Sequence, residues 1–145
     1  MSRINRWTVS GGGLGKLVII PRGKDVKQII ELLNQCFGHY DQSLYDQETS
    51  GSFSHFLVYR TDEGIIAACS VYIKDGYTMF GRLCVSQSHR KQGIARLILD
   101  YLKSKYRVLV WTTNNPELDD FYKKMGGRKT GVKNGFVYWK WTLET

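Results

Sequence analysis

The stretch VSQSHRKQGIARLILDYL, residues 85–102, changes character at Gly93. Polar and basic residues precede Gly93, and apolar residues follow it at the three- and four-residue spacing of an amphipathic helix. A helix start leaves four backbone N–H groups without partners, and a Ser, Thr, Asp or Asn directly before the helix usually accepts from one of them. Here the preceding residues are Arg90, Lys91 and Gln92, which are poor caps. The sequence therefore predicts a helix whose first N–H groups need another partner.

Two interpretations of this loop remain open from the residues alone. The N–H groups and the dipole of an uncapped helix start attract an anion, a glycine admits a bulky phosphate, and Arg90 and Lys91 add positive charge. The loop RKQGIA, residues 90–95, would then hold a pyrophosphate. Alternatively it is an ordinary strand-to-helix connection with solvated basic residues. The other glycine-rich stretch, GGGLGKL at 11–17, matches neither the P-loop nor the dinucleotide fingerprint and is interpreted as linker.

Length and composition indicate one globular domain of 145 residues, 42% of them hydrophobic. No apolar run approaches the roughly 20 residues that span a bilayer, and residues 1–15 lack the apolar segment of a secretory signal, so we expect no membrane association. The three cysteines are far apart and match neither a disulfide framework nor a metal site. We therefore expect a reducing, cytoplasmic setting and no metal. The net charge of +8 favours an anionic partner such as nucleic acid, an acidic protein or a phosphorylated cofactor, and the alternative is a basic surface that only keeps the protein soluble.

Strand-like and helical patterns alternate along the rest of the chain. Strands are expected at 16–20, 55–60, 65–73, 77–86, 107–112 and 136–143, and helices at 25–37, from Gly93 onward, and at 118–125. Asp25 and Gln28 resemble a capping box at the start of the first helix. Segment 38–54 is expected to be irregular apart from one short helix. This order is typical of a single mixed α/β or α+β domain over 16–145, preceded by a flexible arm at 1–15.

Two motifs resemble the GNAT superfamily of acyl-CoA-dependent N-acyltransferases. The family's pyrophosphate motif is Arg or Gln, two residues, Gly, one residue, then Gly or Ala, and RKQGIA at 90–95 matches it after a Leu-x-Val strand. Downstream, NPELDDFYKKMGG at 115–127 has the family's Asn, Tyr and Gly at their usual spacing, although the family commonly has Gly-Phe where this chain has Gly126-Gly127. The resemblance covers Lys16 to about Leu143.

The resemblance implies a fold and a donor. The fold is a mixed, mostly antiparallel sheet of about six to seven strands, flanked by helices and splayed between the strands ending near Val85 and starting near Arg107. Acetyl-CoA would be the acyl-donor cosubstrate, with its pantetheine arm along one strand and its pyrophosphate on the loop, so that the missing helix cap is the ligand. The cofactor-binding residues implied are Leu83, Cys84, Val85, Arg90, Lys91, Gln92, Gly93, Ile94, Ala95 and Asn115.

The implied reaction is direct transfer of the acetyl group to a neutral primary amine in a ternary complex. Tyr122 matches the family's general acid, which protonates the thiolate leaving group; the alternative is a tyrosine of the core or of the CoA wall. Asn115 either contacts CoA or caps the short helix that follows, for which Pro116 suits the first helical position.

The general base is not assigned by the sequence. Many relatives carry a Glu on the strand before the pyrophosphate loop, whereas this chain has Gly81 and Arg82 there. Asp75, His55 and His89 are candidates by side-chain type alone. Cys84 is interpreted as a small buried strand residue rather than a nucleophile.

The acceptor is expected at HYDQSLYDQETSGSF, residues 39–53, which is acidic and aromatic within a basic chain. Tyr40, Asp41 and Asp46 would bind a cationic amine, either a small molecule or a protein lysine or N-terminus. A solvated loop is the alternative.

A second class of function also remains at this stage. The chain would then be a catalytically weak or inactive GNAT-fold module that binds nucleic acid or a protein partner through a basic and aromatic stretch. That stretch comprises Lys123, Lys124, Arg128, Lys129, Lys133, Tyr138 and Trp139. We expect a monomer or a homodimer, the latter through edge pairing of strand 136–143.

Overall fold

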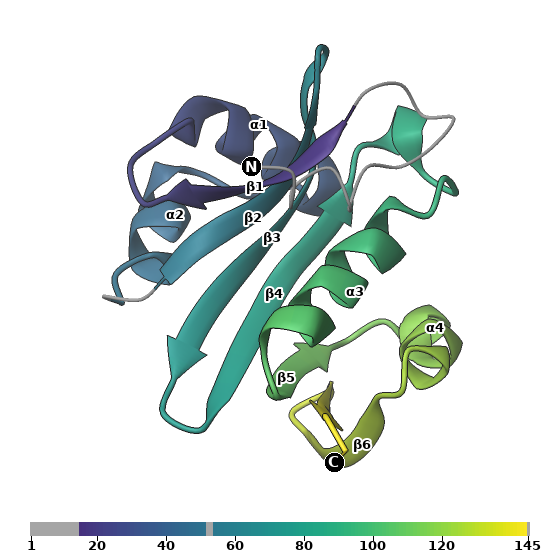
Figure 1. The fold of residues 1–145 in the computed structure, drawn as a ribbon. Helices are drawn as coiled ribbons and strands as arrows, with labels where there is room; N and C mark the ends of the chain where they lie inside the picture. The colour runs from purple at the N-terminus through teal and green to yellow at the C-terminus, as the bar shows by residue number, and fades with distance from the viewer. Residues whose placement is uncertain (1–14, 52–53, 145) are drawn as a thin grey trace.

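Seven strands form one sheet in the order β1-β2-β3-β4-β5-β7-β6 in the computed structural model, which describes residues 15–51 and 54–144 (Figure 1). The strands are β1 Lys16–Pro21, β2 Ser54–Thr61, β3 Gly64–Lys74, β4 Tyr77–Val85, β5 Val108–Thr113, β6 Arg128–Lys133 and β7 Phe136–Thr142. The helices are α1 Val26–Phe37, α2 Gln42–Glu48, α3 Ile94–Lys105 and α4 Asp119–Lys124. Single 3-10 turns span Gln87–His89 and Pro116–Leu118. The expected arm at 1–15 lies outside the described residues except for Gly15.

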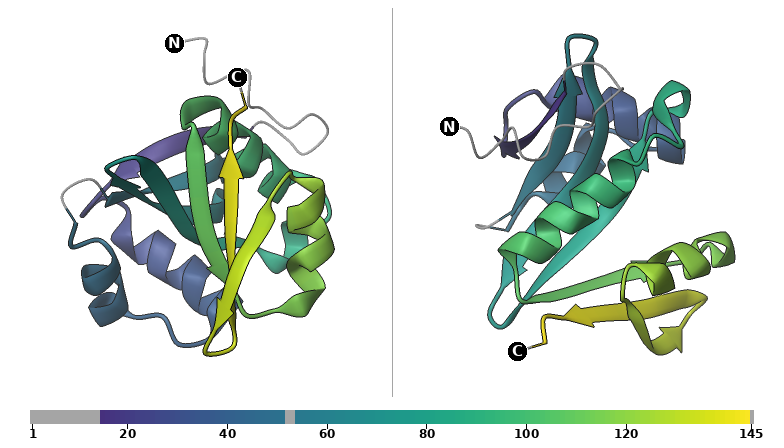
Figure 2. Two further views of the ribbon diagram at one scale, coloured as in Figure 1. Left: turned by 90° about the horizontal axis from the view of Figure 1, so that it is seen from below. Right: turned by 45° about the vertical axis from the view of Figure 1, so that its right-hand side comes forward.

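Strands β4 and β5 are the only parallel neighbours, and the other pairs in the described sheet are antiparallel. The mixed, mostly antiparallel sheet is therefore confirmed. Pairing between β4 and β5 is restricted to Thr78 with Leu109 and Met79 with Val110. Beyond Met79 the two strands diverge, as the right-hand view of Figure 2 shows. The predicted splay between the strand ending at Val85 and the strand near Arg107 is confirmed as well.

Both faces of the β1–β4 half are covered, which explains its nearly continuous apolar strands. Along β2, Phe56 and Val58 pack under α1, whereas Leu57 and Tyr59 belong to the core on the opposite face. This alternation follows from the two-residue period of a strand. Helix α3 covers that opposite face, and Trp111 and Trp139 extend the same core into the β5–β7 half, against α4.

The start of α1 differs from the prediction. Asp25 makes no capping hydrogen bond, and its backbone is left-handed at φ 52°. Its carboxylate instead forms an ion pair with Arg60 NH2 at 2.6 Å. The capping box was therefore wrong, because strand β2 brings a guanidinium to Asp25 that the local sequence does not reveal.

Strand β6 was not predicted. It pairs with β7, so strand 136–143 is not at the edge of the sheet, and the expected edge pairing of a homodimer through that strand was wrong. All residues of β6 are exposed, so it lacks the alternating apolar pattern that marks a strand. Its pairing with β7 is established by the turn at Asn134-Gly135, where both residues have positive φ. Asn-Gly is the preferred pair for such a two-residue hairpin turn, and it is the signal that could have identified β6.

Segment 38–54 contains α2, in agreement with the expected short helix. Within the described residues, no helix combines the length and the apolar character needed to cross a bilayer.

Candidate functional site

The loop between β4 and α3 has the geometry of an anion site. Gly93 has φ 80° and precedes α3, and no side chain caps the first turn, as predicted. A Cβ built at Gly93 would meet no atom within 4 Å, so the space in front of the helix is open. Lys91 and Gln92 are exposed beside it. The first N–H groups of α3 are thus free to bind a phosphate.

The Arg90 side chain is positioned by the end of β4. Its Nε donates to the carbonyl oxygen of Val85 at 3.0 Å. The guanidinium therefore lies against the strand end, between the last residues of β4 and the exposed loop. A positive charge there adds to the field of the helix start.

The residues Leu83, Cys84 and Val85 have a free backbone edge, one that no described strand pairs with, apart from the carbonyl oxygen of Val85, which accepts from Arg90 Nε. Val85 pairs with Ala67 and Cys84 with Ala68 on the β3 side, whereas β5 pairs with neither. An extended ligand could hydrogen-bond to this edge as an added strand would. The free edge ends where the uncapped start of α3 begins, so both sit on one continuous path.

Tyr122 lies on α4 and is buried in an aromatic cluster. Its ring centroid is 5.3 Å from that of Trp111 and 5.7 Å from that of Trp139. Burial is the main factor that raises the pKa of Tyr122, so the phenol stays protonated at neutral pH and can donate a proton but not accept one. The packing role is thus observed, and the role as general acid stays a prediction.

The glycine that departs from the family pattern has a steric reason. Gly126 ends α4 with φ 93°, and the N–H of Gly127 donates to Tyr122 O at 2.9 Å. A Cβ at Gly127 would lie 2.9 Å from the Trp111 ring and 3.0 Å from Tyr122 O. The large indole of Trp111 therefore leaves no room for the family's Phe.

Asn115 serves as a helix cap. Its Oδ1 accepts from the N–H of Glu117 at 3.0 Å, with Pro116 at the first helical position. Of its two expected roles, capping is observed, and contact with CoA stays a prediction.

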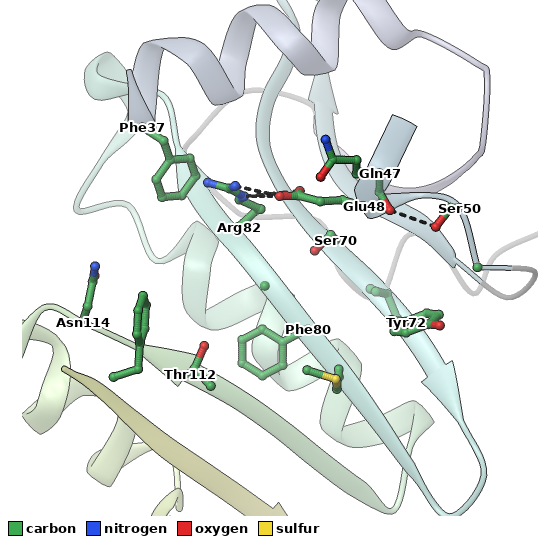
Figure 3. Close-up of a pocket in the computed structure, with 15 residues that line it drawn as sticks. Phe37, Gln47, Glu48, Ser50, Ser70, Tyr72, Phe80, Arg82, Thr112 and Asn114 are labelled. Carbon is green, nitrogen blue, oxygen red and sulfur yellow. Dashed lines mark hydrogen bonds and ion pairs between the residues drawn. The ribbon is translucent and has the colours of Figure 1, made fainter. Parts of the chain in front are cut away.

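A cavity of about 740 Å³ lies on the α1–α2 side of the sheet, at the splay (Figure 3). Glu48 of α2 and Arg82 of β4 line one wall, and Thr112 and Asn114 line the other. Phe80 lies between them. The cavity opens where β4 and β5 part, so it meets the donor edge near the middle of the sheet.

The Arg82–Glu48 pair is the charged feature of this cavity. Glu48 Oε2 lies 2.6 Å from Arg82 Nη2 and 3.1 Å from Arg82 Nε, and the Arg82 guanidinium packs over the rings of Phe37 and Tyr40. The Tyr40 hydroxyl donates to Glu48 Oε1 at 3.0 Å. Desolvation and the nearby carboxylate raise the pKa of Tyr40, which keeps it a donor. These contacts orient one carboxylate in the cavity wall.

Glu48 is the site residue that sequence reasoning missed. It stands 34 positions before Arg82, and only the packing of α2 brings it to the strand where relatives carry a Glu. The sequence shows that Glu48 is one of the acidic residues in segment 39–53, but no local feature indicates that Glu48, and not Asp41 or Asp46, is the residue that reaches Arg82.

The expected acceptor residues lie elsewhere. Asp41 Oδ1 caps α2 by accepting from Leu44 N at 3.0 Å, and Asp46 accepts from Gln42 on the exposed face of that helix. Neither lines the cavity, and the buried Tyr40 reaches it through Glu48. Direct acceptor contacts of Tyr40, Asp41 and Asp46 stay predictions, and this cavity does not support those of the two aspartates.

The three candidate bases named by side-chain type also lie away from this cavity. His89 Nδ1 is hydrogen-bonded to Ser86 Oγ, and its Nε2 lies 3.4 Å from Glu63 Oε1 beside a smaller cavity. His55 lies on β2, and burial lowers its pKa. Asp75 is in the β3–β4 turn. None of these three residues lines the cavity beside Arg82.

Two residues of the basic and aromatic C-terminal stretch make contacts within the domain. Trp139 is 1% exposed, and Lys129 pairs with Asp119 at 2.7 Å. A buried indole offers no stacking surface to a base. The nucleic-acid interpretation therefore loses two of the residues on which it rested.

Comparisons with known proteins agree with this geometry. Residues 52–126 match the family model described as an acetyltransferase (GNAT) domain. A GNAT family acetyltransferase from Elizabethkingia anophelis with acetyl-CoA bound is 21% identical, with a TM-score of 0.68 over 88% of this chain and 98% of that one. PaiA N-acetyltransferase from Thermoplasma acidophilum, in complex with coenzyme A, is 15% identical, with a TM-score of 0.67 over 88% and 99%. An acyl-CoA N-acyltransferase from Pseudomonas aeruginosa is 16% identical, with a TM-score of 0.72 over 88% and 99%.

Proposed function

Because the chain belongs to the acetyltransferase (GNAT) domain family, we propose that it transfers an acetyl group from acetyl-CoA to a primary amine. The observation that carries this proposal is the continuous path from the free edge of β4 to the uncapped start of α3. Two of the similar structures hold acetyl-CoA or coenzyme A, which supports the same donor here.

The donor residues fit an acyl-CoA by their chemistry. The backbone of Leu83, Cys84 and Val85 would hydrogen-bond the pantetheine amides, and the N–H groups from Lys91 to Ala95 would bind the pyrophosphate. Arg90 and Lys91 would balance its charge. Acetyl-CoA supplies the activated thioester.

The acceptor amine would enter through the cavity at the splay. We assign Glu48 as the group that receives the proton of the attacking amine, directly or through water, because it is the carboxylate in the cavity wall. The amine nitrogen bonds to the acetyl carbon as the carbon–sulfur bond breaks, and Tyr122 donates the proton that the leaving sulfur takes up. The cavity accepts either a small amine or the end of a lysine side chain or N-terminus.

The setting proposed for this reaction is reducing and cytoplasmic, with the protein as a monomer or homodimer. The three cysteines are free thiols, which agrees with a reducing compartment.

The experiment that tests the proposal is thermal unfolding with and without acetyl-CoA. A ligand at about 100 times its dissociation constant stabilises a protein by roughly 2.7 kcal/mol, which shifts the midpoint by several degrees. A shift would be followed by a screen of amines for CoA thiol release. If acetyl-CoA, longer acyl-CoAs and free CoA all leave the midpoint unchanged, the proposal is overturned.

A further inference from the structure

Two thiols lie close together near the end of β4, and neither side chain has a role in the proposed acetyl transfer. Cys36 lies in the last turn of α1, and Cys84 lies on β4 in the core against which Cys36 packs. The Cys36 Sγ is 3.6 Å from the carbonyl oxygen of Val85, the residue that follows Cys84. Each thiol shifts the pKa of the other, and Cys36 packs against the cluster that contains Cys84, so the two side chains lie close together. They therefore form a pair across the α1–β4 contact.

The two cysteines differ in what surrounds them. Cys36 is partly exposed, and the Arg90 guanidinium binds the same Val85 carbonyl oxygen at 3.0 Å. The neighbouring Cys84 thiol and then the nearby Arg90 lower the pKa of Cys36 to about 6. Cys84 is buried, and the neighbouring Cys36 thiol and then burial raise its pKa. A partly exposed thiol near a guanidinium, with a buried thiol beside it, is the arrangement of a reactive cysteine and its resolving partner.

The third cysteine provides an internal contrast. Cys69 is 0% exposed in the core on the opposite face of the sheet, and burial raises its pKa. Its Sγ contacts the carbonyl oxygen of Ser70 at 3.4 Å. A buried thiol of this kind is unreactive toward oxidants.

We propose that Cys36 and Cys84 form an oxidation site, at which Cys36 reacts with a peroxide and Cys84 closes an intramolecular disulfide. The Cys36 sulfur attacks one peroxide oxygen, the O–O bond breaks, and a sulfenic acid forms as water or an alcohol leaves. The Cys84 sulfur then bonds to the Cys36 sulfur, and the S–O bond breaks to release the second oxygen as water. The two cysteines lose two electrons, and the peroxide gains them.

The first test uses the unmodified protein and no enzymatic assay. Alkylation of each cysteine by iodoacetamide is followed by peptide mass mapping as a function of pH. The Cys36 rate should rise with a midpoint near pH 6, since the thiolate is the nucleophile. Cys69 should react only after unfolding. A Cys36 midpoint at the value of an ordinary thiol, above pH 8, would overturn the proposal.

The second test is exposure to hydrogen peroxide, followed by mapping without reduction. We expect a cross-linked peptide pair that contains Cys36 and Cys84, which reductant cleaves. Cys69→Ala should leave it unchanged, Cys36→Ala should abolish it, and Cys84→Ala should leave a Cys36 sulfenic acid that dimedone traps. Peroxide treatment that leaves both thiols separately alkylatable, or takes Cys36 to sulfinic acid with Cys84 free, overturns the proposal. Neither test depends on acetyl transfer, so failure of the proposed function would leave both informative.

Discussion

Arg82 shows how one residue in an unusual conformation can organise a site. Its φ of 51° is left-handed, which costs a non-glycine residue roughly 1–3 kcal/mol. The ion pair with Glu48 and the rings of Phe37 and Tyr40 hold it there. Backbone strain of this kind clusters at functional sites, which agrees with the placement of the cavity around this pair.

The role of Glu48 predicts a specific loss in Glu48→Gln. The variant keeps the shape of the side chain but cannot take a proton, so turnover should fall about 100-fold, the lower end for general acid–base catalysis. The acetyl-CoA-induced shift in midpoint should remain, because Glu48 is not on the donor path. Asp62→Asn, which changes an exposed carboxylate in the β2–β3 turn away from the cavity, is the control and should leave turnover unchanged. Full turnover in Glu48→Gln would exclude Glu48 as the base.

Tyr122→Phe separates the two roles of this residue. The ring stays packed between Trp111 and Trp139, so the free energy of unfolding should change by less than about 1 kcal/mol. Turnover should fall about 100-fold if the hydroxyl protonates the leaving sulfur. Tyr106→Phe, a half-buried tyrosine beside the same core, should not affect the rate. Unaltered steady-state turnover in Tyr122→Phe would leave only the packing role.

At the scale of elements, a substitution at the start of α3 tests whether this helix end binds the phosphates of acetyl-CoA. Gly93→Ala places a Cβ in open space but at φ 80°, so the free energy of unfolding should fall by about 1–2 kcal/mol from backbone strain. The acetyl-CoA shift should be largely lost, because the Cβ occupies the space proposed for the phosphates.

Gly76→Ala is the matched control for that loss. Gly76 has φ 84°, and its Cβ would also meet no atom within 4 Å, but it lies in the β3–β4 turn, which is not part of the proposed donor site. Denaturant unfolding should show a similar loss of stability in both variants. Only Gly93→Ala should lose the ligand response, and equal responses in the two would contradict the phosphate role.

At the scale of the whole molecule, burial of His55 couples folding to pH. Burial lowers its pKa below the usual 6.5, so the unfolded chain takes up a proton at a pH where the folded protein does not. More protons bound in the unfolded state mean that stability falls as the pH drops below about 6.5. Urea unfolding at several pH values should show this loss, and His55→Gln should reduce it. If the loss of stability at low pH is the same in His55→Gln as in the unmodified protein, it arises from other groups.

Most elements follow from local pattern, because their apolar spacing is set by a buried face. Strands β1 to β5 and β7 and the helices α1, α3 and α4 lie close to where the sequence predicts them. Strand β6 could not be predicted from apolar spacing, because none of its residues is buried. The capping box at Asp25 was predicted wrongly, because the ion-pair partner of Asp25, Arg60, belongs to another element. Within the candidate site, the loop before α3 could be predicted from the sequence, because the absence of a capping residue is a local property.

The sequence by itself therefore determined the class of sheet, the uncapped start of α3 and the resemblance to the acetyltransferase family. Only the tertiary structure decided at which residue β4 and β5 part, that Glu48 supplies the carboxylate beside Arg82, and that Cys36 packs against the cluster that contains Cys84. The physical reason is the range of the interactions. Caps and periodic patterns act within a few residues, whereas these contacts depend on how α1 and α2 pack across the sheet.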